Sequence, residues 1–260
     1  MDMRNLQKHL NEVLARLSRQ KRVLLLADFD GTLSPLAESP AKARLPQSTR
    51  ETLLRLGRSH RILVAILSGR PLGYLKSVFG CQWFIYGGNH GLEMEGPNFY
   101  FCHPRARSLR SVIRSLARQF QEPVQDVPGA LLENKGFSLA LHYRKVPPSH
   151  RANFDALVER LREKAAGLPV RWRPGDQVWE VLPRVAWDKG RAAEALVEHL
   201  GHPFPVAMGD DKTDEDMFQA LSGKGITVHV GHSGDSSAEF CLKRQSEVPR
   251  FLKFLEEVLQ

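Results

Sequence analysis

The sequence predicts an α/β protein with a three-layer core, built on a parallel sheet, and a smaller inserted α+β domain. Continuous apolar runs of strand length occur at residues 23–27, 62–67 and 204–208, and amphipathic stretches with helical spacing lie between them. Such runs are typical of parallel strands buried on both faces, and right-handed crossovers place the connecting helices against the sheet. The middle of the chain loses this alternation, which indicates an insertion.

The predicted core consists of residues 1–91 and 184–260. We assign a helix where apolar residues recur every three or four positions, and a strand where they are continuous. In chain order the expected elements are a helix at 6–17, a strand at 23–27, a helix capped by Ser48 or Thr49, a strand at 62–67, a helix with Pro71 in its first turn, a strand at 83–86, a helix at 189–200 and a strand at 204–208.

Residues 92–183 are the predicted inserted domain. Alternating apolar residues from Phe137 to Tyr143 indicate a strand with one buried face, and paired strands are expected around Trp172 and Trp179. Two helices are also expected, one at 149–166 and one that carries arginines at every fourth position, Arg110, Arg114 and Arg118. We interpret these arginines as a solvated helix face.

The composition is typical of a globular protein. No stretch has the roughly 20 apolar residues of a membrane span, and the charged N-terminus does not fit a secretory signal, so we expect a cytoplasmic protein without a membrane partner. The net charge of +8 comes from basic residues spread along the chain, which argues against a nucleic-acid partner and favours attraction of anionic substrates. The three cysteines have no metal-type spacing.

Two aspartates follow the first apolar run. Asp28 and Asp30 flank one aromatic residue in the string D-F-D-G-T-L. Open α/β sheets form their sites beyond the carboxyl ends of the strands, so both carboxylates should project into a cleft. Their repulsion is relieved if a cation lies between them or if one keeps its proton, and Mg²⁺ favours such oxygen ligands. The alternative is an Asp-Gly turn capped by the second aspartate.

Three further positions at strand ends or helix starts carry polar groups. Ser68 follows the second core strand, where its hydroxyl could bind a phosphoryl oxygen, although Ser-Gly also occurs in plain turns. Lys189 precedes a helix and could neutralise a nucleophile and a phosphate, or lie on the surface. Residues 209–216 gather acidic groups at a helix N-terminus, where capping explains only one of them, so a cation is expected.

The string D-x-D-G-T-L, followed in order by Ser68, Lys189 and the acidic cluster at 209–216, resembles the four motifs of the haloacid dehalogenase (HAD) superfamily of phosphatases. The resemblance implies a HAD-like core in which Asp28 attacks phosphorus and forms an aspartyl phosphate. It implies that Asp30 protonates the leaving alcohol and then activates water. Ser68 and Lys189 would be the other catalytic residues.

The same resemblance implies Mg²⁺ as the cofactor. Its ligands would be Asp28, the backbone carbonyl of Asp30 and Asp210, with Asp211 or Asp214 acting directly or through water.

Nearly the full chain is similar to trehalose-6-phosphate phosphatases. The similarity is carried by residues 89–93, 133–144, 179–181 and 209–215. It implies hydrolysis of trehalose 6-phosphate to trehalose and phosphate, with the inserted domain acting as a cap that sets substrate specificity. It also implies that Glu133, Lys135 and Glu180 hold the distal glucose.

Other polar residues near these segments are candidates for substrate contact: Arg70, Asn89, His90, His142 and Arg144. Sugar hydroxyls both donate and accept hydrogen bonds, so alternating acidic and basic side chains can bind them and reject analogues that lack a hydroxyl. The alternatives are a surface ion pair for Glu133 and Lys135, a structural role for His142, and loop ordering by Asn89 and His90.

Two competing functions fit parts of the sequence. A phosphatase for sucrose phosphate or for glucosyl- or mannosyl-3-phosphoglycerate would share the core, but its cap should lack the E-x-K and H-Y-R strings. A non-catalytic subunit of a sugar synthase complex would not need every catalytic position, and all are filled here. The chain shows no region of glycosyltransferase size, so we expect any trehalose-6-phosphate synthase partner to be a separate protein.

Overall fold

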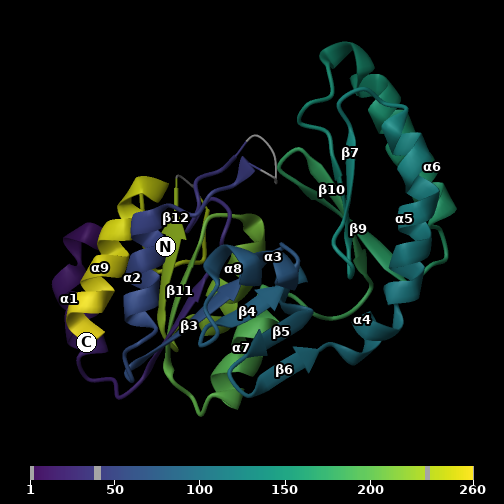
Figure 1. The fold of residues 1–260 in the computed structure, drawn as a ribbon. Helices are drawn as coiled ribbons and strands as arrows, with labels where there is room; N and C mark the ends of the chain where they lie inside the picture. Colours follow the sequence, from purple (N-terminus) through teal and green to yellow (C-terminus); the bar gives the residue numbers. More distant parts are fainter. Residues whose placement is uncertain (1–2, 38–41, 232–234, 260) are drawn as a thin grey trace. The chain divides into compact units, whose positions relative to one another are not determined.

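The structure is a computed structural model that describes residues 3–37, 42–231 and 235–259 (Figure 1). The chain forms two compact units. The core unit comprises the described residues up to Phe101 and from Trp187 onward, and the inserted unit comprises Cys102–Ala186.

The core unit is built on one mixed, mostly parallel sheet with the strand order β1-β13-β12-β11-β2-β3-β4-β5-β6. Neighbouring strands from β1 to β4 run parallel, and β5 is antiparallel to β4. The strands are β1 (Arg4–Asn5), β2 (Val23–Ala27), β3 (Ile62–Leu67), β4 (Ile85–Gly88), β5 (Glu93–Gly96), β6 (Phe99–Cys102), β11 (Phe204–Gly209), β12 (Ile226–Val230) and β13 (Phe240–Leu242).

Helices cover both faces of this sheet and make it the middle of three layers. The longer helices of the core unit are α1 (Leu10–Leu17), α2 (Gln47–Leu56), α3 (Leu72–Phe79), α7 (Lys189–His199), α8 (Lys212–Leu221) and α9 (Val248–Leu259). Short 3₁₀ helices occur at η1 (Leu6–Lys8), η3 (Asn89–Gly91) and η5 (Gln245–Glu247).

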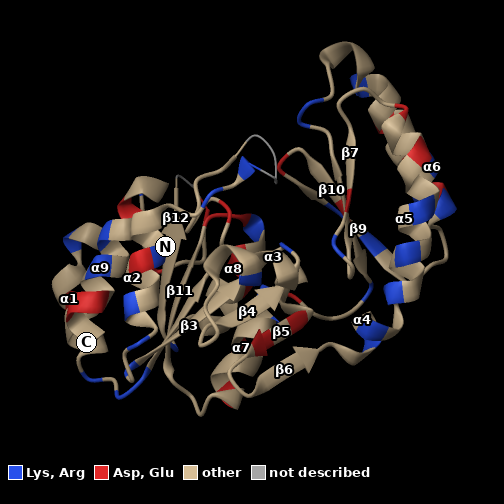
Figure 2. Cartoon of the chain, in the orientation of Figure 1, with Lys and Arg blue, Asp and Glu red and all other residues tan. Residues whose placement is uncertain are grey.

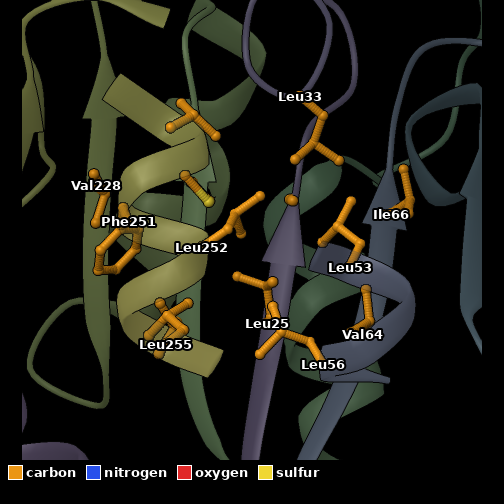
Figure 3. Packing of buried hydrophobic residues seen from close by; sticks show 14 of the residues in the cluster. Leu25, Leu33, Leu53, Leu56, Val64, Ile66, Val228, Phe251, Leu252 and Leu255 are labelled. Carbon is orange, nitrogen blue, oxygen red and sulfur yellow. The ribbon is translucent and has the colours of Figure 1, made fainter. Parts of the chain in front are cut away.

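Successive side chains of the central strand β2 point to opposite faces of the sheet, and the core unit therefore has an apolar cluster on each face. Leu25 belongs to a cluster with residues of α2 and α9 on one face (Figure 3), and Leu24 and Leu26 belong to a cluster with residues of α7 and α8 on the other. All three leucines are fully buried. Because β2 is flanked by the parallel strands β11 and β3, their carboxyl ends meet at one edge of the sheet.

The inserted unit contains a four-stranded antiparallel sheet with the order β7-β8-β10-β9. Its elements are α4 (Pro104–Ser108), α5 (Arg110–Gln125), β7 (Leu131–Asn134), β8 (Leu139–His142), η4 (Pro148–His150), α6 (Arg151–Lys164), β9 (Val170–Gly175) and β10 (Val178–Pro183). The side chains of Leu139, Leu141 and Val181 pack with α5 and α6 in an apolar cluster. Figure 2 shows basic residues along these helices, and Arg110, Arg114 and Arg118 are exposed.

The predicted α/β fold with a parallel central sheet is confirmed. The two units, however, change over at 101–102 and 186–187, later in the chain than the predicted boundaries of 91–92 and 183–184. The reason is that β5 and β6 extend the core sheet beyond β4 instead of joining the inserted unit.

Four local predictions were displaced. The amino-terminal helix α1 begins at Leu10 and not at residue 6, because Leu6–Lys8 form the 3₁₀ helix η1 directly after β1, which pairs with β13 at the sheet edge. The N-cap of α2 is Pro46 and not Ser48 or Thr49, and Pro71 is the N-cap of α3 instead of lying in its first turn. The strand predicted at 83–86 is β4, which begins at Ile85.

Among the residues that the structure describes, no helix is both long enough and apolar enough to cross a membrane.

We expect Leu25→Ala to lower the free energy of unfolding by about 2–5 kcal/mol, because it removes a fully buried side chain from the centre of the core and leaves a cavity. Urea denaturation measures the change. Leu14→Ala is the matched control, because Leu14 is 41% exposed and its truncation should have a much smaller effect. Equal losses in the two variants would contradict the prediction.

Candidate active site

Three polar residues lie where neighbouring parallel strands end. Asp28 follows β2, Ser68 follows β3 and Asp210 follows β11. The backbone N–H of Asp28 still donates to the carbonyl of Met208 at 2.9 Å, and that of Ser68 donates to Gly87 at 2.9 Å. The sheet ladders therefore hold these residues rigidly at one edge of the sheet.

The centre of the site is a cluster of carboxylates. Asp28, Asp210 and Asp214 each offer one oxygen, and these oxygens all lie within 4.8 Å of one another. Asp28 and Asp214 are buried. This arrangement brings together three of the five predicted metal ligands, and oxygen donors so close together fit a hard divalent cation such as Mg²⁺.

Two glycines allow these carboxylates to approach the backbone. Gly31 has a φ of +82°, and a Cβ built there would lie 2.0 Å from Oδ2 of Asp210. At Gly209, a Cβ would lie 2.2 Å from Cγ of Asp214. Since any side chain would displace the carboxylates, glycine is required at both positions.

Lys189 lies at the start of α7 and is buried beside the cluster. Its Nζ donates to Oδ1 of Asp28 at 2.6 Å and to Oδ1 of Asp214 at 2.7 Å. The other oxygen of Asp214 accepts from the backbone N–H groups of Asp210 and Asp211, at 3.0 and 3.1 Å. Both oxygens of Asp214 thus have protein partners, and the burial of Lys189 excludes the surface position that the sequence left open as the alternative.

The cluster contains more acidic than basic groups. Burial raises the pKa of Asp28 well above its usual range, although the Lys189 ammonium opposes this. Burial, together with the charge of Asp214, raises the pKa of Asp210 to about 7. Burial lowers the pKa of Lys189, but the charges of Asp214 and Asp28 outweigh it and raise this pKa, so Lys189 stays protonated. One ammonium faces three carboxyl groups, and an added cation would relieve the repulsion.

Asp30 has a different environment from Asp28. Its two oxygens accept from Arg70, Oδ2 from Nε and Oδ1 from Nη2, both at 2.6 Å. The Arg70 guanidinium also lies 4.9 Å from the centroid of the Tyr74 ring. The two aspartates of the D-x-D string are therefore held by different cations, and Arg70, predicted to bind substrate, here positions Asp30.

Ser68, Asn89 and His90 belong to two loops that are tied together. The N–H of Asn89 donates to the carbonyl of Arg70, and that of His90 donates to the carbonyl of Ser68, both at 2.9 Å. Asn89 and His90 both have a positive φ. Nδ2 of Asn89 donates to Oε1 of Glu93 at 3.1 Å. These bonds agree with loop ordering as the role of Asn89.

Asp211 caps a helix. Its carboxylate accepts from the N–H of Lys212 at 2.7 Å, and the side chain is exposed at the N-cap of α8. Of the two acids left open by the sequence, Asp214 is the one that joins the carboxylate cluster.

The inserted unit gathers four predicted residues on one face of its sheet. Nε2 of His142 lies 2.9 Å from Oε2 of Glu133. Nζ of Lys135 donates to Oε1 of Glu180 at 3.1 Å, and both of these residues are largely buried. Arg144 does not join them, because it pairs with the exposed Asp176 near the turn between β9 and β10.

Sequence reasoning missed two residues. Thr32 donates from Oγ1 to Oδ1 of Asp210 at 3.1 Å, and the string D-x-D-G-T already contained it. Arg173 donates to Oε2 of Glu180 from Nη2 at 2.6 Å and from Nε at 3.2 Å. Arg173 could have been found from the tight β9–β10 hairpin, because the register of this strand pair places Arg173 directly opposite Glu180.

The fold of the chain is that of HAD-like hydrolases. A haloacid dehalogenase-like hydrolase from Bacteroides thetaiotaomicron has the same fold, with a TM-score of 0.62 at 16% identity, over 90% of this chain and 99% of that one. The trehalose-phosphatase family model matches residues 26–246.

Two further relatives are more specific. Probable trehalose-phosphate phosphatase H of Arabidopsis thaliana is 32% identical over 269 residues, which cover 95% of this chain and 75% of the relative. The C-terminal domain of Candida albicans trehalose-6-phosphate phosphatase superposes with a TM-score of 0.80 at 23% identity, over 98% of both chains. The chain belongs to the trehalose-phosphatase family and is a phosphoric monoester hydrolase.

We expect Mg²⁺ to stabilise the protein more near pH 8 than near pH 5. The pKa of Asp210 in the folded, metal-free protein is about 7, above its ordinary value of 3.8. The folded state therefore binds the proton of the Asp210 carboxyl group more tightly than the unfolded state does. The stability that this proton contributes is fully present below about pH 4 and is lost as pH rises through about 7. Mg²⁺ needs deprotonated ligands and replaces that stabilisation at high pH.

Thermal melts with and without Mg²⁺ at the two pH values measure this difference. Asp210→Asn should remove most of it, and Asp155→Asn, at an exposed position on α6, should leave it unchanged. A shift in melting temperature that is the same at both pH values would contradict the prediction.

Proposed function

We propose that the protein hydrolyses trehalose 6-phosphate to trehalose and phosphate through an aspartyl phosphate on Asp28, with Mg²⁺ as the cofactor. The observation that carries the proposal is the cluster of Asp28, Asp210 and Asp214, two of which pair with the buried Lys189, in a chain of this family. Its relatives are named for trehalose phosphate as substrate.

Asp28 is the nucleophile in this proposal. Its carboxylate oxygen forms a bond to phosphorus while the bond between phosphorus and the sugar oxygen breaks. Lys189, which donates to Oδ1 of Asp28 at 2.6 Å, orients the carboxylate and balances charge as the phosphoryl group transfers. The Ser68 hydroxyl, at the end of β3, is suited to hydrogen-bond a phosphoryl oxygen.

Asp30 is the proton carrier. In the first step its carboxyl group gives a proton to the leaving sugar oxygen, and trehalose departs. In the second step its carboxylate takes a proton from water, whose oxygen bonds to phosphorus while the bond between phosphorus and the Asp28 oxygen breaks. Arg70 donates hydrogen bonds to both oxygens of Asp30 and fixes the orientation of this carboxyl group.

The residues that would hold Mg²⁺ are Asp28 and Asp210, with the backbone carbonyl of Asp30. Asp214 is better suited to support them, because both of its oxygens already accept hydrogen bonds within the protein. When bound, the ion would neutralise negative charge on the phosphate and the carboxylates.

The polar face of the inserted unit supplies specificity in this proposal. Glu133, Lys135 and Glu180 alternate in charge and lie beside His142, which suits hydroxyl groups that both donate and accept. We assign this face to the glucose ring that carries no phosphate. A separate synthase as the source of the substrate, and a cytoplasmic location, stay predictions of the sequence.

Phosphate release from a substrate panel tests the proposal. The panel contains trehalose 6-phosphate, sucrose 6-phosphate, glucose 6-phosphate and glucosyl-3-phosphoglycerate, each with Mg²⁺ and with chelator. We expect trehalose 6-phosphate to be strongly preferred and its turnover to be lost with chelator. Asp28→Asn should lower kcat by about 10³-fold or more, because it removes the nucleophile, while Asp155→Asn should not change it.

Preference for another ester would keep the reaction but overturn the assignment of the sugar. No release from any ester with Mg²⁺ would overturn the proposal and favour a non-catalytic role.

A further inference from the structure

Glu180 is held from two sides in the inserted unit. It is 8% exposed, and its two oxygens have different cationic partners. Oε1 accepts from Nζ of Lys135 at 3.1 Å, while Oε2 accepts from Nη2 and Nε of Arg173 at 2.6 and 3.2 Å. The rotation of this carboxylate about its terminal bond is therefore fixed by the protein before any ligand arrives.

The strand register explains why Arg173 reaches Glu180. In the β9–β10 pair Arg173 lies directly opposite Glu180, and in the β10–β8 pair Glu180 lies opposite Ala140. Ala140 in turn lies opposite Glu133 on β7. Because opposite residues share one face of a sheet, these four side chains form a row in which a small residue separates the two glutamates.

The charges along this row balance. Glu133 and Glu180 are matched by Lys135 and Arg173, and His142 contacts Glu133. Arg173 itself is only partly buried, with 23% of its side chain exposed. Without Arg173, Glu180 would lose the cation that binds its Oε2, and this oxygen could turn toward a different partner.

We propose that Arg173 is a positioning residue that sets the sugar specificity of the inserted unit by fixing the direction in which Glu180 accepts hydrogen bonds. The inference rests on the proposed function, since it assigns Glu180 to an uncharged ring of the substrate. It adds a residue that acts through Glu180 and not on the reacting phosphate. A hydroxyl at the wrong carbon of the ring would meet a carboxylate that cannot rotate to accept it.

Steady-state kinetics of the full chain with two substrates test the inference. Trehalose 6-phosphate uses both units in the proposed function, whereas an aryl phosphate without a sugar, p-nitrophenyl phosphate, uses only the core. We expect Arg173→Gln to raise KM for trehalose 6-phosphate by about tenfold, with a smaller change in kcat. For the aryl phosphate kcat/KM should stay unchanged, which also shows that the variant is folded.

Two variants serve as controls. Arg160→Gln changes the same residue type at an exposed site on α6, which packs against the opposite face of the sheet, and should leave KM for trehalose 6-phosphate unchanged. Arg173→Lys keeps the charge but loses the planar fork that binds Oε2 through two nitrogens, so we expect it to recover only part of the lost affinity.

A double-mutant cycle separates positioning from direct contact. If Arg173 acts through Glu180, the double variant Arg173→Gln with Glu180→Gln should have the same KM for trehalose 6-phosphate as Glu180→Gln alone. Additive effects would show that Arg173 binds the sugar independently and would overturn the inference.

Other outcomes have distinct meanings. An Arg173→Gln variant with the KM of the Arg160→Gln control, or one that loses activity equally toward both substrates, would overturn the inference while the proposed function stands. Wild-type protein that hydrolyses the aryl phosphate but not trehalose 6-phosphate would overturn the proposed function, and the inference with it.

Discussion

Three carboxyl groups and one ammonium lie close together at the end of the parallel sheet. The arrangement of the residues around the site depends on this excess of acidic over basic groups. Lys189 contacts Asp28 and Asp214 but cannot neutralise all three acids. In water such groups would separate, but here the strand ends hold them together. The stored repulsion makes the site receptive to a cation and to the charge changes of phosphoryl transfer.

The surrounding backbone is shaped by the same constraint. Gly31 and Gly209 leave room for carboxylates at distances that a Cβ would block, and backbone N–H groups donate to Asp214 at the start of α8. Asp30, only two residues from Asp28, is held instead by Arg70. Two chemically identical groups, two residues apart, thus acquire different partners and different surroundings.

In the inserted unit, the ratio of cationic partners to buried acidic groups is the reverse of that in the core unit. Glu180 pairs with two cations, Lys135 and Arg173, whereas Asp28 and Asp214 share Lys189. A site with balanced charge suits a neutral polyol, and a site with excess negative charge suits a cation. The contrast supports a division in which one unit performs the chemistry and the other selects the sugar.

The sequence by itself determined the buried strands and the residues that end them, because apolar period and position at a strand end are local properties. Asp28 and the acidic segment at 209–216 were identified in this way, whereas Ser68 and Lys189 were chosen through their resemblance to the motifs of the HAD superfamily. The spacing of apolar residues could not show that β5 and β6 join the core sheet, since the pairing of strands depends on segments distant in the chain.

The tertiary structure also decided the partners of individual side chains. It turned Asp214 toward the cluster and left Asp211 as an exposed helix cap, although both lie in the same acidic run. It placed Arg173 against Glu180 through the register of a hairpin. The partners of these side chains depend on the orientation of the first turn of α8 and on the register of β9 and β10, and residue types alone do not specify either.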